Sequence, residues 1–281
     1  MKTNFYYDFA DEVYQSENEI IKTKQNKSKN IITTWIELLK DDNEYNKKKG
    51  NYITLEIDDL ENIDSNHLIN SISKEIEKLM QIHHISKKKK ILVVGLGNDD
   101  YNSDALGPRV VDNILITSHL IKHLPSNTRS VSSFKPGVMS KTGLESSNMV
   151  KALKDKEQFS LIIVIDSLAT TSVNRLYKVI QITDTGISPG SGVLNHRLAL
   201  DKDTLGCPII CIGIATVLES AFLIYDYLKD YDENITPFQI REKLELNNHN
   251  YIVTSKEIDR LINELASYIS KGINKALNSN L

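Results

Sequence analysis

Cysteine is scarce in this sequence, and long apolar runs are missing. The only cysteines among 281 residues are Cys207 and Cys211, which we expect on one strand. Four residues of a strand span roughly 13 Å, which is too far for a disulfide. They are therefore expected to be buried thiols in a reducing compartment. Without a run near the roughly 18 apolar residues of a membrane helix, and without a signal-peptide pattern, the chain is expected to be soluble and cytoplasmic.

A strong charge of either sign is also missing. The net charge is −3 and the isoelectric point is about 6.2, so no general basic field favours direct nucleic-acid binding. A DNA-associated partner would have to be recognised as a protein.

The usual signatures of several enzyme classes are absent. There is no G-x-S-x-G elbow for a serine hydrolase, and the G-x-G of Gly95 and Gly97 has Asp100 where a dinucleotide site needs its third glycine. His119 and His123 have helix spacing but no H-E-x-x-H pattern, so we interpret them as surface or packing residues. We therefore expect no metal and no cofactor.

Alternating apolar segments indicate an α/β fold. Strands are expected at 52–57, 91–95, 131–134, 160–165, 177–182 and 208–212, and helices at 31–39, 63–85, 108–124, 146–154, 215–228 and 255–277, with a polar connection over 230–250 and a capping box at 254–257. Strands that alternate with helices predict a three-layer sandwich with a mostly parallel sheet. The core is expected over 91–228, inside a single domain that runs from 9 to 281.

Two aspartates follow apolar strands and carry the functional argument. Asp104 comes after the strand and glycine turn at 91–97, and Asp166 directly follows the apolar run 160–165. Carboxyl ends of parallel strands form the ligand crevice of such sheets, and paired carboxylates are suited to general acid–base work. The structural alternative for each aspartate is an N-cap on the following helix.

Two glycine-rich loops are expected beside these aspartates. One is Lys135–Gly143, and the other, Asp184–Arg197, contains Gly190, Ser191 and Gly192. Backbone N–H groups in such loops can bind an oxyanion or a peptide carbonyl. With the loops that carry the aspartates, they predict one crevice built from four strand ends.

At these residues the chain resembles the spore germination protease family of endospore-forming bacteria. The matching stretches are Val93–Asn98, Asp104–Pro108, Pro136–Met139, Ile165–Asp166, Ile180–Val193, Thr204–Gly206 and Val253–Asp259. The resemblance implies a hydrogenase-maturation-peptidase-like fold and an aspartate-dependent endopeptidase that degrades small acid-soluble spore proteins in the spore core. It also implies a zymogen, a homotetramer, and catalytic roles for Asp104 and Asp166.

The N-terminus is similar to the processing site of that family. The family cleaves before a large apolar residue that follows an acidic one and precedes alanine, a small polar residue and glutamate. Asp8-Phe9-Ala10-Asp11-Glu12 fits this pattern except at Asp11. We therefore predict autocleavage between Asp8 and Phe9, with residues 1–8 as a propeptide; the alternative is an ordinary acidic N-terminus.

Some positions depart from the family pattern and keep two other interpretations open. Thr171 replaces an arginine and Leu194 a glycine, while the region 230–250 is shorter than in many relatives. Thr171 and Leu194 would suit a sporulation protein that has lost catalysis. A hydrogenase-maturation-type endopeptidase is the other alternative, and His196 would then be its nickel-sensing histidine.

Overall fold

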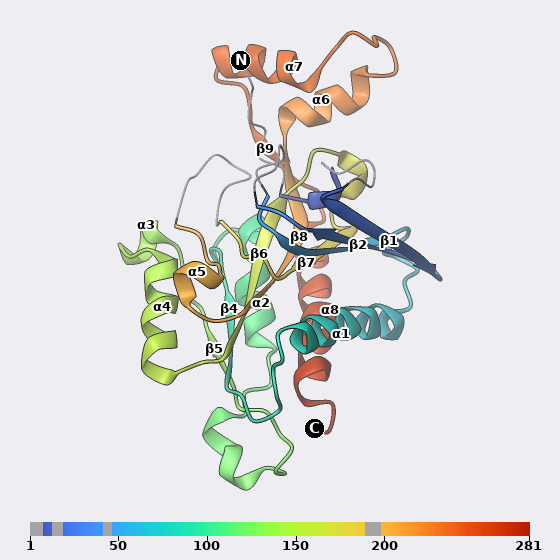
Figure 1. The fold of residues 1–281 in the computed structure, drawn as a ribbon. Helices are drawn as coiled ribbons and strands as arrows, with labels where there is room; N and C mark the ends of the chain where they lie inside the picture. Colours follow the sequence, from blue (N-terminus) through green and yellow to red (C-terminus); the bar gives the residue numbers. More distant parts are fainter. Residues whose placement is uncertain (1–7, 13–18, 42–46, 189–197) are drawn as a thin grey trace.

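The computed structural model describes residues 8–12, 19–41, 47–188 and 198–281 (Figure 1). The strands of the described chain are β1 (Ile21–Ser28), β2 (Ile31–Leu38), β3 (Gly50–Ile57), β4 (Ile91–Gly95), β5 (Val131–Phe134), β6 (Leu161–Ala169), β7 (Val179–Thr183), β8 (Ile209–Glu219) and β9 (Ile252–Val253). The α-helices are α1 (Ser65–Ile82), α2 (Leu106–Asp112), α3 (Met139–Thr142), α4 (Ser146–Glu157), α5 (Lys202–Leu205), α6 (Ser220–Leu228), α7 (Pro237–Leu246) and α8 (Ile258–Asn278). Short 3₁₀ helices are η1 (Ala10–Glu12), η2 (Asn102–Asp104), η3 (Ser118–His123) and η4 (Val173–Arg175).

The sheet is mixed, which corrects the predicted mostly parallel sheet. Its strand order is β1-β2-β3-β7-β8-β6-β4-β5, and β9 pairs with β8. Only the pairs β5–β4, β4–β6 and β6–β8 are parallel, whereas the remaining pairs are antiparallel. The prediction failed because a two-residue turn joins β1 to β2, so the polar head forms an antiparallel meander on β7 instead of a crossover unit.

Helices cover both faces of the parallel part of the sheet. One core cluster contains apolar residues of α1, α2 and α8 together with Val93, Ile163 and Ile212. A second cluster on the opposite face contains residues of α4 and α5 together with Val164 and Cys211. The side chains of the strands alternate between the two clusters, as they do in a sheet buried on both faces.

The segment predicted as a helix at 31–39 is strand β2, so that prediction was wrong. Its apolar spacing fits a helix, but Ile31, Ile32, Thr33 and Thr34 are β-branched and favour a strand. Pairing on both sides, to β1 and to β3, satisfies its backbone groups. The expected strand at 52–57 and helix at 63–85 are confirmed as β3 and α1.

Several boundaries after β4 also differ from the prediction. The helix expected over 108–124 is the shorter α2 followed by η3, and the helix expected from residue 215 begins at Ser220 because β8 continues to Glu219. Helix α7 lies in the expected polar connection, and the predicted box at 254–257 does not cap α8 by a side chain. The Thr254 hydroxyl bonds instead to Tyr177 and to the carbonyl of Thr216.

Among the described residues, Cys207 and Cys211 are buried free thiols, as expected, although Cys207 precedes strand β8. In the described part of the chain, no helix combines the length and apolar character that crossing a membrane requires.

Candidate active site

Asp166 lies within strand β6, whereas the sequence placed it directly after the strand. The strand continues to Ala169, and the Asp166 side chain lies beside Gly213 of β8 and is only 6% exposed. Its Oδ1 accepts a hydrogen bond from the backbone N–H of Ser167 at 2.9 Å. The next helix, η4, begins after Ser172 without a side-chain cap. Asp166 is therefore a buried carboxylate on the sheet and not a helix cap.

Asp104 lies in η2, in the turn between β4 and α2. Its backbone carbonyl and its Oδ2 both accept a hydrogen bond from the N–H of Asn98, each at 3.0 Å. Helix α2 has Ala105 at its N-cap position, with no side-chain cap. Asp104 therefore closes the glycine turn instead of capping the helix.

Close backbone contacts bring the turn that carries Asp104 to the strand that carries Asp166. Leu96 donates from its N–H to the carbonyl of Ile165 at 2.8 Å, and the Thr216 hydroxyl on β8 donates to the carbonyl of Ser103 at 3.0 Å. A Cβ atom on Gly107 would lie 2.6 Å from that same Ile165 carbonyl oxygen. Helix η2 packs against β6 and β8. The two aspartates therefore lie on neighbouring elements at one edge of the parallel strands.

The predicted crevice of four loops is confirmed only in part. The loop after β5 does reach the loop after β4, through ion pairs of Lys135 with Asp99 at 3.6 Å and of Lys141 with Asp100. Strand β7, however, is antiparallel to β8, so its carboxyl end does not lie at the edge shared by the parallel strands. Gly190, Ser191 and Gly192 lie outside the described residues, as do Leu194 and His196.

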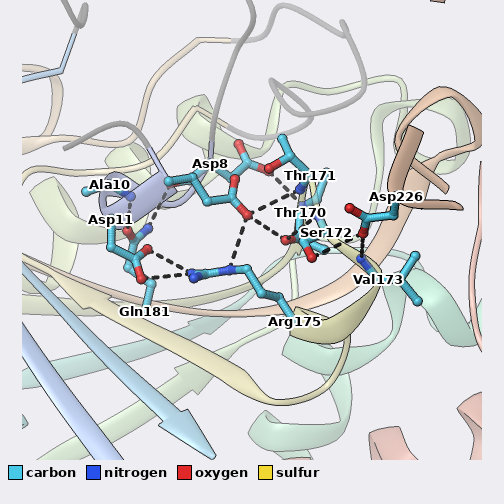
Figure 2. A network of polar contacts seen from close by, with 12 residues as sticks. Asp8, Ala10, Asp11, Thr170, Thr171, Ser172, Val173, Arg175, Gln181 and Asp226 are labelled. Atoms are coloured by element: carbon cyan, nitrogen blue, oxygen red, sulfur yellow. Dashed lines mark hydrogen bonds and ion pairs between the residues drawn. The ribbon is translucent and has the colours of Figure 1, made fainter. Parts of the chain in front are cut away.

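The segment Asp8–Glu12 lies against the same face of the sheet as Asp166. Phe9 and Ala10 are fully buried, and Phe9 packs with Leu168, Val179 and Ala215. Gln181 of β7 accepts the N–H of Ala10 through Oε1 at 2.8 Å. Its Nε2 donates to the carbonyl of Asp8 at 2.9 Å (Figure 2).

Acidic side chains fix this segment to the loop after β6. Asp8 Oδ2 accepts the N–H of Ala169 at 2.8 Å, and Glu12 Oε1 accepts the Thr170 hydroxyl at 2.5 Å and the N–H of Thr171 at 3.2 Å. Arg175 donates through Nη2 to both Asp11 oxygens, at 2.8 and 2.9 Å (Figure 2). Its Nε lies 3.2 Å from Glu12 Oε1. The loop therefore carries a charge-pairing arginine even though Thr171 replaces the one expected.

A cavity of about 210 Å³ lies beside the bound segment. Its lining includes Asp8, Lys47, Gln181, Gly213 and Ile187. Lys47 Nζ donates to the carbonyl oxygen of Asp8 at 3.2 Å, and burial lowers the pKa of Lys47. Burial, with Asp166 as a nearby negative charge, raises the pKa of Cys211 well above its ordinary range.

Sequence reasoning missed Lys47, Arg175 and Gln181. Gln181 stands in an apolar strand, where a buried amide needs partners, and that position was the available signal. Lys47 lies in the polar head, where nothing in the pattern distinguishes it from its neighbours. No group of three or more His, Cys, Asp or Glu side chains suited to a metal ion occurs among the residues that the structure describes.

Comparison with known proteins identifies relatives over most of the chain. The sequence model of the germination protease family matches residues 5–232. Several of these relatives are named germination protease. The one from Clostridium tetani (strain Massachusetts / E88) is 36% identical over 95% of this chain and 93% of its own length. The one from Caldanaerobacter subterraneus subsp. tengcongensis is 37% identical over 97% of this chain and 93% of its own length. The one from Bacillus subtilis (strain 168) is 35% identical over 82% and 78%, respectively.

Proposed function

The chain belongs to the germination protease family and is a peptidase, and from this premise we propose that it is an autoprocessed, aspartate-dependent endopeptidase of germinating spores. Its substrates are small acid-soluble spore proteins in the spore core. It is made as a zymogen, with residues 1–8 as propeptide, and it works as a homotetramer with the family's hydrogenase-maturation-peptidase-like fold.

One observation carries this proposal. The pentapeptide that resembles the family's processing site is buried against β6 and β7, on the face of the sheet where Asp166 lies. An ordinary acidic N-terminus would not need contacts to its backbone at Asp8 and Ala10 and to the carboxylates of Asp8, Asp11 and Glu12. The arrangement is the one expected of a peptide held for cleavage.

The proposed mechanism uses the two aspartates as an acid–base pair. One of them, ionised, takes a proton from water as the water oxygen attacks the carbonyl carbon between residues 8 and 9. The other, protonated, delivers its proton to the departing nitrogen of Phe9. Two neighbouring carboxylates share protons most readily when one of them is desolvated, and Asp166, which is 6% exposed, is the candidate for the acid.

The test compares full-length protein with Asp104→Asn and Asp166→Asn variants. Each is incubated alone and with a small acid-soluble spore protein, and fragments are identified by mass. We expect the wild-type chain to lose residues 1–8 and then to cleave the spore protein, and either substitution to lower both rates by at least about 10³-fold.

Full activity in both variants would overturn the two-aspartate mechanism. Absence of cleavage by the wild-type chain and by a form that begins at Phe9 would favour an inactive sporulation protein. Loss of cleavage with a chelator would reopen the metal-dependent alternative.

A further inference from the structure

We propose that the groove that holds Asp8–Glu12 is the substrate site of the enzyme, in which Gln181 and Lys47 bind the carbonyl oxygen of the scissile bond and Arg175 selects acidic residues after it. The inference rests on the proposed peptidase function and assigns residues to it. The ligand is an extended peptide with the order acidic, large apolar, small, acidic, acidic.

Gln181 binds the peptide backbone on both sides of Phe9. Its amide offers a donor to the carbonyl of Asp8 and an acceptor to the N–H of Ala10, which is how the edge of a strand would pair with an extended chain. Gln181 is 6% exposed, and a buried amide without partners is costly. Removal of the N-terminal segment would thus leave this site ready for another peptide.

The carbonyl of Asp8 has two donors, Gln181 Nε2 at 2.9 Å and Lys47 Nζ at 3.2 Å. When the water oxygen bonds to that carbon, the C=O electron pair moves to the oxygen. When the C–N bond breaks, the pair returns to form the new carboxyl group, and the Phe9 nitrogen leaves with a proton from the acid. Donors aimed at this oxygen stabilise the intermediate, a role that we predicted from the sequence for backbone N–H groups of the loop Asp184–Arg197.

The side chains of the groove explain which peptides fit. Phe9 fills an apolar pocket, and Ala10 is fully buried, so a larger residue at that position would have to displace its neighbours. The two acidic positions that follow face Arg175. Each of these contacts is to a residue of Asp8–Glu12, so a short peptide with the sequence of this segment should contain all the residues that the groove selects.

The test measures kcat and KM for the processed full chain with two synthetic peptides that contain Asp-Phe-Ala-Asp-Glu or Asp-Phe-Ala-Asn-Gln. We expect Gln181→Met and Gln181→Glu to lower kcat by about 10²-fold or more on both peptides. Arg175→Gln should raise KM for the acidic peptide by about tenfold and remove the preference between the peptides. Gln25→Met and Arg260→Gln, which change exposed side chains of β1 and α8, are the matched controls.

A structural role alone would lower stability without changing which peptide is preferred. An unchanged peptide preference in Arg175→Gln, together with an unchanged kcat in both Gln181 variants, would overturn the inference while the peptidase function stood.

If no cleavage occurs, a binding measurement separates the groove assignment from the peptidase function. It uses a full-length double variant, Asp166→Asn with Glu12→Arg. Glu12→Arg replaces an attraction to Arg175 with repulsion and so weakens docking of the chain's own segment. We expect the labelled acidic peptide to bind this double variant more tightly than Asp166→Asn alone, and addition of Arg175→Gln to abolish that binding. Failure of the peptide to bind the double variant would overturn the groove assignment, whatever the catalytic result.

Discussion

At the scale of single residues, opposing effects of burial and polar contacts act on Glu12 in the N-terminal segment. Burial raises the pKa of Glu12 above its ordinary value of 4.5, although the Thr170 hydroxyl and Arg175 oppose the shift. Burial therefore weakens the hold on the ionised carboxylate, and Arg175 restores part of that hold. In the proposed function the segment is held for cleavage and then released, and an anchor of this kind suits both steps.

The pH dependence of docking follows from that pKa. A group whose pKa is raised in the docked state contributes stability that is fully present below 4.5 and is lost as the pH rises through the docked-state pKa. We expect opening of Asp8–Glu12, measured by amide exchange in the full-length Asp166→Asn chain, to become easier over this range. Glu12→Gln should flatten the dependence, and an equal slope in both chains would contradict the assignment.

Gly107 shows that the site also depends on a residue with no side chain. A Cβ atom at this position would lie 2.2 Å from the carbonyl oxygen of Leu96 and 2.6 Å from that of Ile165. Leu96 directly follows β4, before the turn that carries Asp104, and Ile165 directly precedes Asp166 in β6. The close approach is possible only with glycine, and it fixes α2 against the sheet.

We expect Gly107→Ala to lower the free energy of unfolding by about 1–3 kcal/mol and to lower the peptidase rate, because the turn that carries Asp104 has to shift. Gly143→Ala is the control, since its Cβ atom meets nothing within 4 Å. That control has a φ of +71°, so it should cost roughly 1–2 kcal/mol of backbone strain, and it serves as a control for stability alone. Thermal unfolding and peptide cleavage measure both effects. An unchanged rate in Gly107→Ala would show that the turn tolerates the shift.

At the scale of elements, the sequence predicted the parallel core well and the flanking strands poorly. A short continuous apolar run such as 160–165 is typical of a strand that is buried on both faces of a parallel sheet, so its interpretation was straightforward. Ile31–Leu38 has apolar spacing that fits a helix or a strand, and only its partners β1 and β3 decide. The aspartates were predicted because each follows an apolar run of the sequence, whereas Gln181 and Lys47 contact a segment whose position depends on tertiary packing.

Asp184, which directly follows β7, connects strand β3 with the end of helix α1. It accepts hydrogen bonds from the N–H of Asn51 at 2.7 Å, from Asn51 Nδ2 at 2.8 Å and from His83 Nε2, 2.9 Å away. Burial would raise the pKa of Asp184, but the bonds from His83 and Asn51 outweigh it and hold this pKa below 3.8. A carboxylate with a depressed pKa contributes stability above its unfolded value, and that stability is lost as the pH falls through the folded-state pKa.

We expect Asp184→Asn to lower the free energy of unfolding by about 1–3 kcal/mol near neutral pH. The difference from wild type should shrink as the pH falls below 3.8. Asp230→Asn, at an exposed position after α6, should change stability by less than about 0.5 kcal/mol. Denaturant unfolding at several pH values measures both, and a difference that grows on acidification would contradict the assignment.

For the molecule as a whole, the segment that occupies the groove has to leave it before another peptide can bind there. The proposed cleavage between Asp8 and Phe9 would remove one anchor, but Phe9, Ala10 and Glu12 begin in the groove and would block other peptides. The cut also creates a new terminal ammonium group on Phe9, which is fully buried in the uncleaved chain. An unpaired charge is costly to bury, and Lys47, which bonds to the adjacent carbonyl, adds a second cation when it is protonated.

Processing should therefore expel residues 9–12 and open the groove. We expect amide exchange of this segment to be much faster in the processed chain than in full-length Asp166→Asn, and cleavage of added peptide to begin only after processing. A semisynthetic chain that starts at Phe9 with an acetylated nitrogen carries no charge there, so its segment should stay protected and its activity on added peptide should be low. Equally low protection in the acetylated and free forms would show that loss of the Asp8 anchor alone accounts for release, and equally high protection would show that processing does not expel the segment.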